Sequence, residues 1–292
     1  MRLSNSNLRY ILCRQSVIIL SGYFKIVLIL TTSFLTFTSY AERLPSVANL
    51  QLHIKDSPQV IRIIEPHLNQ QGNKTEIEYF GYPVTKVFDW FFGSRWKEKD
   101  AYIEFKTLDG YLSRIKVSRF NQYSAYLVFG IKDRSEFIVD KSVQGESNIQ
   151  LGPYYLIWDN IREPELVAEG ATDWPYQITE IIISKQDKQA LLPFSLTELY
   201  SEHAELTQRH CLTCHQINGY GGNKWPINLA SQIKNMSKGE FRSWVLNPRT
   251  QNPNALMPPL LETLPEVKRQ AIADKIYEYL LALPDTIVPV SE

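Results

Sequence analysis

Sulfur-containing residues are scarce in this chain, whose 292 residues include three cysteines and three methionines. So few cysteines exclude a disulfide framework and a four-thiolate zinc site. Cys13 lies in an N-terminal segment that we expect to be removed, so only Cys211 and Cys214 remain in the mature chain. This pair can form a single strained disulfide or hold a single cofactor.

The chain also lacks net charge, with 31 basic and 31 acidic side chains. Residues 1–41 contain four basic residues and no acidic one, and the remaining chain has a net charge of −4. A mildly acidic chain without a basic cluster does not favour nucleic acid, so we expect no nucleic-acid partner. Hydrophobic residues make up 44% of the chain. There is no low-complexity tract or internal repeat, so a disordered chain is excluded.

The N-terminus has the pattern of an export signal. A basic stretch ends at Lys25, an apolar run follows, and the small residues Ser39 and Ala41 occupy positions −3 and −1 of a cleavage site. We therefore predict a signal peptide over residues 1–41 and a mature protein that is periplasmic or otherwise exported. The alternative is an uncleaved anchor that associates the protein with a membrane. Val17–Phe37 is long enough to span one, although Lys25 in its middle argues against this.

Alternating apolar and polar residues predict a strand-rich region over residues 42–190. Its strongest signal is a hairpin, because Ala101–Thr107 and Tyr111–Val117 alternate on either side of Asp109-Gly110, a dipeptide typical of tight turns. Further predicted elements are the strands Ala125–Phe129, Tyr154–Trp158 and Gln177–Ile183 and the short helix Val84–Phe92.

The pattern changes near Pro193, after which helical spacing dominates. The predicted helices run from Ser195, where Glu198 completes a capping box, to about His210, over Gly239–Leu246, and from Thr263 to Pro284, with a polar loop over Gln216–Pro226. The sequence therefore predicts a two-domain α+β fold. An N-terminal β-rich mixed domain over residues 42–190 is followed by an all-α domain over residues 195–287.

The segment Cys211-Leu-Thr-Cys214-His215 has the C-x-x-C-H spacing of a c-type haem attachment site. Two thiols at this spacing can add to the two vinyl groups of a single haem, and the adjacent histidine then lies under the iron. A zinc site needs more ligands, and a redox-active cysteine pair is expected at a strand-to-helix junction rather than at the end of a helix. The motif predicts one covalent haem c, with His215 as the proximal iron ligand.

The second axial ligand is expected downstream, on the opposite haem face. Met257 is followed by two prolines, which stiffen a turn that can hold a weak thioether ligand in place. Met236 lies in a polar stretch and is predicted to be a surface residue. His203 precedes the motif on the proximal side and cannot easily reach the far face, whereas His53 and His67 are predicted to be ordinary surface histidines of the other domain.

Residues 195–287 resemble a class I cytochrome c domain. The resemblance rests on the helix before the attachment motif, on Trp225-Pro226, on Trp244 and its neighbours, on Met257-Pro-Pro and on the terminal helix. It implies that the first and last helices cross beside the haem. It also implies that the Pro226 carbonyl accepts a hydrogen bond from the proximal imidazole and that Trp244 lines the haem pocket. By residue type alone, Trp244 could equally be a core aromatic.

Residues 75–184 resemble the molybdopterin-binding domain of the sulfite oxidase family. The resemblance rests on the order of Asp109-Gly110-Tyr111, a Leu-Val-Phe strand, Gly152–Trp158 and a closing strand that begins with Trp174-Pro-Tyr. In that family a cysteine thiolate binds molybdenum, whereas both retained cysteines are assigned to haem here. We therefore expect no molybdopterin and name no catalytic residue in this region. The alternative is an unrelated β-rich binding module.

These features predict an exported c-type cytochrome that transfers single electrons between redox partner proteins, with the upstream domain docking a partner. The alternative is a haem-containing oxidoreductase, in which the upstream domain oxidises a small substrate and passes the electrons to haem. A third hypothesis is a sensor in which a diatomic gas displaces Met257, although the proline-braced loop argues for a ligand that stays bound.

Overall fold

The computed structural model describes residues 40–68, 74–141, 146–185, 188–193, 196 and 198–284. The expected signal peptide lies outside these residues up to position 39, and the predicted capping residue Ser195 also lies outside them. The cleavage site expected after Ala41 falls within strand β1 (Tyr40–Arg43). Among the described residues, no helix is both long and apolar enough to cross a membrane. The described residues group into one compact unit.

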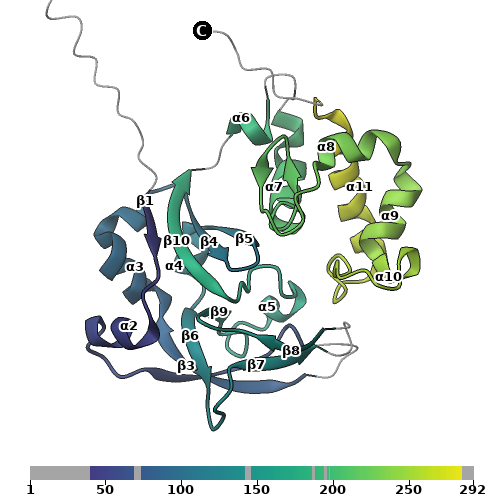
Figure 1. The fold of residues 1–292 in the computed structure, drawn as a ribbon. Helices are drawn as coiled ribbons and strands as arrows, with labels where there is room; N and C mark the ends of the chain where they lie inside the picture. Colours follow the sequence, from purple (N-terminus) through teal and green to yellow (C-terminus); the bar gives the residue numbers. More distant parts are fainter. Residues whose placement is uncertain are drawn as a thin grey trace, which may run out of the picture. The chain divides into compact units, whose positions relative to one another are not determined.

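The first part of the described chain, residues 40–185, is called the β-rich segment (Figure 1). One of its sheets has the strand order β1-β10-β4-β5, another has the order β2-β3-β6-β9, and β7 pairs with β8. Neighbouring strands in these sheets are antiparallel. The strands are β2 (Gln59–Ile64), β3 (Glu76–Pro83), β4 (Ala101–Thr107), β5 (Leu112–Lys116), β6 (Ala125–Ile131), β7 (Ile138–Lys141), β8 (Glu146–Gln150), β9 (Tyr155–Trp158) and β10 (Ile178–Lys185). The helices are α2 (Val47–His53), α3 (Val84–Phe92), η1 (Gly93–Lys97), α4 (Val117–Gln122) and α5 (Glu165–Ala168).

Apolar side chains of both four-stranded sheets form one hydrophobic cluster within the β-rich segment. Strand β9 is buried at each of its residues, and helix α3 buries the apolar residues of one face while Trp90 is exposed. A carboxylate also lies inside, because Glu65 is fully buried and accepts hydrogen bonds from the hydroxyls of Tyr79 at 2.6 Å and Tyr155 at 3.0 Å. A buried carboxylate needs such donors, so this network ties the end of β2 to β3 and β9.

The predicted hairpin at Asp109-Gly110 is confirmed. Strands β4 and β5 pair antiparallel on either side of it. The Asp109 carboxylate closes the turn by accepting hydrogen bonds from the Thr107 hydroxyl and, at 3.1 Å, from the Tyr111 amide. Gly110 has a φ of +85°, a conformation that glycine adopts without a Cβ penalty.

Residues 188–284 form the C-terminal segment, which has a hydrophobic cluster of its own. Helix α11 packs against both α7 and α9. Ion pairs join the same helices, from Lys275 to Glu202 of α7 at 2.6 Å and from Asp274 to Arg242 of α9. The elements are α6 (Lys188–Leu191), η3 (Glu198–Tyr200), α7 (Ser201–His210), β11 (Gln216–Ile217), β12 (Tyr220–Gly221), α8 (Leu229–Gln232), η4 (Ile233–Asn235), α9 (Lys238–Leu246), α10 (Pro248–Gln251) and α11 (Glu266–Ala282).

The prediction of an all-α C-terminal domain, and with it the two-domain α+β fold class, is wrong: the chain is a mixed α/β structure. Strands β11 and β12 pair antiparallel directly after the attachment motif. Asn218 and Gly219, with φ of +48° and +86°, make the turn between them, because consecutive left-handed residues suit a two-residue hairpin. The sequence predicted a loop over Gln216–Pro226, since strands of two residues are too short to show alternation.

Candidate functional site

The attachment motif lies at the carboxyl end of helix α7. The amide of Cys211 donates to the Thr207 carbonyl at 2.9 Å, and the amide of His215 donates to the Cys211 carbonyl at 2.9 Å. These bonds gather both cysteines and the histidine on a single turn of chain. Cys211 and Cys214 are free thiols rather than a disulfide. Burial raises the pKa of Cys211 to about 12 and also raises the pKa of Cys214.

The His215 ring is oriented by a backbone carbonyl. Its Nδ1 lies 2.9 Å from the carbonyl oxygen of Trp225. The family resemblance implied the carbonyl of Pro226 as the acceptor, and this is wrong: the acceptor is the carbonyl of Trp225. The reason is that the Trp225 amide donates to the Cys214 carbonyl at 2.9 Å, which fixes Trp225 beside the motif. A protonated Nδ1 leaves Nε2 as the nitrogen that can bind a metal. Burial lowers the pKa of His215, which favours the neutral ring.

Two glycines allow the chain after β11 to lie close against the motif. A Cβ on Gly222 would lie 2.0 Å from the Thr213 carbonyl oxygen, and a Cβ on Gly221 would lie 2.2 Å from the His215 carbonyl oxygen. Neither position leaves room for a side chain. The Gly222 amide also donates to the Leu212 carbonyl at 2.8 Å. Sequence reasoning missed this role, although adjacent glycines shortly after the motif were a usable signal.

Met257 lies in the segment between α10 and α11. It is half buried and packs against the C-terminal hydrophobic cluster, which also contains Cys211. The chain just after it is tied to two helices, because the Leu260 amide donates to the Val245 carbonyl of α9 at 2.8 Å and Arg269 of α11 donates to the Leu260 carbonyl at 2.7 Å. The chain beside Met257 is thus restrained by helices α9 and α11, and its role as second axial ligand stays a prediction.

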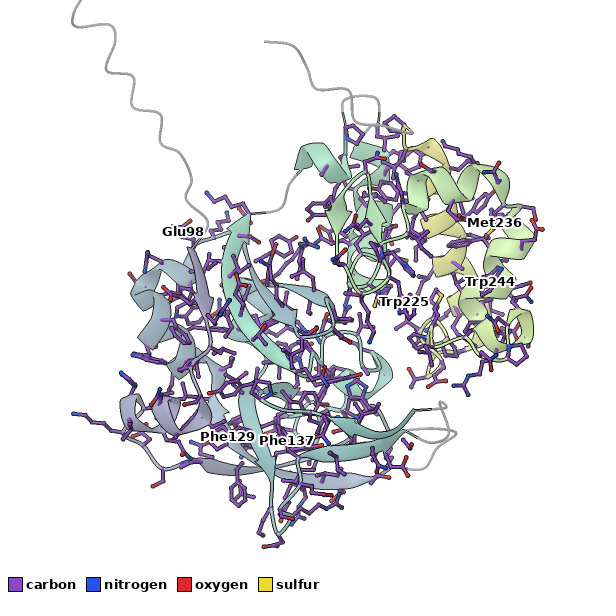
Figure 2. All side chains as sticks on the ribbon, viewed as in Figure 1. Glu98, Phe129, Phe137, Trp225, Met236 and Trp244 are labelled. Carbon is purple, nitrogen blue, oxygen red and sulfur yellow. The ribbon has the colours of Figure 1, made fainter. Side chains whose placement is uncertain are left out.

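The other residues singled out from the sequence are placed as follows. Trp244 lies on α9 and is half buried, and Trp225 is exposed in the chain after β12 (Figure 2). That Trp244 lines a haem pocket stays a prediction. Met236 packs against the C-terminal hydrophobic cluster, so its prediction as a surface residue is wrong. His67 is buried, with Nε2 at 3.3 Å from the Trp174 carbonyl, so its surface prediction is also wrong, whereas His53 is exposed.

Acidic residues of the β-rich segment hold the end of helix α7. Arg209, two residues before Cys211, pairs with Asp173 at 2.7 Å and also with Glu169. Glu169 pairs in turn with Arg119 at 2.6 Å. Burial alone would lower the pKa of Arg209, but the two carboxylates raise it above its usual value. Within the described part of the chain, no group of three or more His, Cys, Asp or Glu side chains is arranged to hold a metal ion. A haem iron bound by one histidine and one methionine would not form such a group.

Part of the chain is similar to a known cytochrome. It is 38% identical over 87 residues to cytochrome c-555 of Methylococcus capsulatus, and the match covers 29% of this chain and 62% of that protein. The chain therefore spans less than two thirds of the length of this relative. No family model and no solved structure matches the chain, and the comparisons give no support to a molybdopterin-binding domain. The match supports a cytochrome c segment within this chain.

Proposed function

We propose that the chain is an exported c-type cytochrome that transfers single electrons between redox partner proteins. Its haem is attached covalently to Cys211 and Cys214, with His215 and Met257 as axial ligands. The observation that carries the proposal is the C-x-x-C-H motif at the end of α7, with the His215 Nδ1 at 2.9 Å from the Trp225 carbonyl. The similarity to cytochrome c-555 supports the same function.

The residues at the motif fit a covalently attached haem. The cysteines are free thiols on one turn of chain, as addition to two vinyl groups of a single haem requires. The bond to the Trp225 carbonyl selects the tautomer of His215 and fixes the ring orientation, which leaves Nε2 for the iron. The close approach at Gly221 and Gly222 holds the chain beneath the motif in one position.

Electron transfer requires that the chain hold the axial ligands in place. When bound, a haem supplies an iron that takes up and releases one electron, and a methionine opposite a histidine raises its potential relative to two histidines. The bonds of Leu260 to α9 and α11 restrain the chain next to Met257, so the weaker ligand is positioned before the iron changes oxidation state.

The proposal also covers the rest of the chain. A signal peptide over residues 1–41 directs export, the cytochrome c domain spans residues 195–287, and the β-rich domain over residues 42–190 docks a redox partner. The mature N-terminus, determined by sequencing the exported protein, tests the first of these assignments. Cleavage after Ala41 is the expected result, and retention of the leader would contradict it.

The test of the attachment chemistry compares single substitutions in a host that exports and matures c-type cytochromes. Cys211→Ala or Cys214→Ala should leave one thioether, seen as a shifted reduced pyridine–haem spectrum. His215→Ala should abolish the stable low-spin site. Cys13→Ala is the matched control, because Cys13 lies in the leader and should change nothing. An unchanged low-spin spectrum in His215→Ala would contradict the axial assignment.

A further inference from the structure

The turn between β4 and β5 of the β-rich segment bonds to the attachment motif through backbone groups. The amide of Leu112 donates to the Thr213 carbonyl at 2.9 Å, and the amide of Asn223 donates to the Gly110 carbonyl at 2.8 Å. Thr213 lies between the two motif cysteines, and Asn223 directly follows the glycine that packs on the motif. The turn is therefore bonded both to the motif and to the chain that supports it.

One side chain of the same turn strengthens this contact, and another fixes the turn within the β-rich segment. The Asp109 carboxylate pairs with the Lys224 ammonium at 2.7 Å, and the Tyr111 hydroxyl donates to the Thr172 carbonyl at 2.6 Å. Burial raises the pKa of Tyr111 well above its usual value, and the Cys214 thiol adds to the effect because it lies close by. The Leu112 amide bond thus places the turn, with its aromatic Tyr111, against Thr213, the residue just before Cys214.

Gly110 has a role in this contact beyond its turn conformation. A Cβ at this position would lie 2.9 Å from the Asn223 carbonyl carbon and 3.0 Å from the Lys224 amide nitrogen. Gly93 also has a positive φ, of +58°, but a Cβ there would meet nothing within 4 Å. Alanine would therefore strain the backbone at both positions. Only at Gly110 would its Cβ also collide with the C-terminal segment.

We propose that Asp109–Leu112 form a clamp that positions the haem-attachment motif and shields the Cys214 side of the haem from water. This inference rests on the proposed function, since shielding has meaning only if a haem is attached. Water stabilises the more highly charged ferric state, so excluding it raises the reduction potential. The clamp residues are thus positioning residues that act through the motif.

The test compares Gly110→Ala with Gly93→Ala in the full-length protein, with and without haem. In Gly110→Ala the amides of Leu112 and Asn223 should exchange with solvent deuterium at least about tenfold faster, because the clamp opens more often. In Gly93→Ala they should exchange as in the parent. The reduction potential should fall in Gly110→Ala and stay unchanged in Gly93→Ala.

Asp109→Asn is a second variant that keeps the glycine and removes the charge paired with Lys224. It should speed the exchange of the Leu112 and Asn223 amides by a smaller factor than Gly110→Ala, and it tests the contact if Gly110→Ala does not fold. The clamp alone would be overturned if the parent carries haem and the two glycine variants behave alike. In that case Gly110→Ala and Gly93→Ala would show the same exchange rates at Leu112 and Asn223 and the same reduction potential. A parent without covalent haem would overturn the proposed function and the shielding role together. Amide exchange at Leu112 and Asn223 in the haem-free chain would still show whether the turn bonds to the motif.

Discussion

Replacing Asp173 by asparagine should destabilise the folded chain, because its carboxylate lies between two guanidinium groups. The side chain is 8% exposed, its Oδ2 lies 2.7 Å from Nη2 of Arg209, and the same oxygen lies 3.4 Å from Nε of Arg119. Asparagine keeps the shape of the side chain and removes the charge, so both cations are left with Glu169 as their shared carboxylate.

The magnitude follows from the burial of the partners. Removing one member of a fully buried ion pair costs about 3–5 kcal/mol. The Arg209 side chain is 34% exposed, so water offsets part of this loss, and Glu169 continues to neutralise part of the charge. We therefore expect a loss of about 2–3 kcal/mol in the free energy of unfolding, which lowers the midpoint of thermal unfolding by roughly 4–12 °C.

The assay is thermal and urea unfolding followed by circular dichroism, with Asp100→Asn as the control. Asp100 is exposed and has a φ of +64°, which asparagine tolerates. The control should change stability by no more than about 0.5 kcal/mol. Equal unfolding midpoints for Asp173→Asn and Asp100→Asn would refute the reasoning that the β-rich segment holds helix α7 through a buried charge.

Three further predictions concern the site and its surroundings. Gly222→Ala should sharply reduce covalent haem per chain, measured by haem staining, because its Cβ would lie 2.0 Å from a carbonyl oxygen of the motif; a normal yield would show that this approach is dispensable. Met257→Leu should keep the covalent haem, lose the absorbance band of the methionine–iron bond and lower the reduction potential. Met236→Leu should leave both the band and the potential unchanged. Burial would raise the pKa of Glu169, but two arginines hold it below its usual value. Its ion pairs therefore stabilise the folded chain above the unfolded pKa of about 4.3 and are lost as the pH falls through the lower folded pKa. Glu169→Gln should make stability depend less steeply on pH below about pH 5 in urea titrations, and an unchanged slope would contradict this.

Local sequence patterns predicted much of the β-rich segment. Helix α3 has the bounds Val84–Phe92 that the sequence predicted, β4 covers Ala101–Thr107, and β9 and β10 begin one residue later than expected. These elements are long enough for apolar residues to repeat with a clear period. The C-x-x-C-H motif can likewise be recognised from the sequence alone, because its spacing involves residues that are close together in the chain.

The sequence did not predict features that depend on contacts between distant segments. Strands β11 and β12 carry no periodic signal, and the bond from Asn223 to Gly110 joins residues of the C-terminal and β-rich segments. The hydrogen-bond acceptor for His215 was expected to be the Pro226 carbonyl and is the Trp225 carbonyl. The backbone bond between Trp225 and Cys214 sets which carbonyl faces the histidine. Such registers are decided by packing and not by residue type.

The central claim, that a haem is attached at Cys211 and Cys214, is tested most directly by the metal content of the exported protein. The measurement is iron and molybdenum per chain, made after denaturation so that only covalently held haem remains. The account predicts one iron per chain on the denatured polypeptide and no molybdenum in the native protein. Absence of covalent iron from protein matured in a competent host would contradict the account, and molybdenum beside the iron would contradict the non-catalytic role assigned to the β-rich segment.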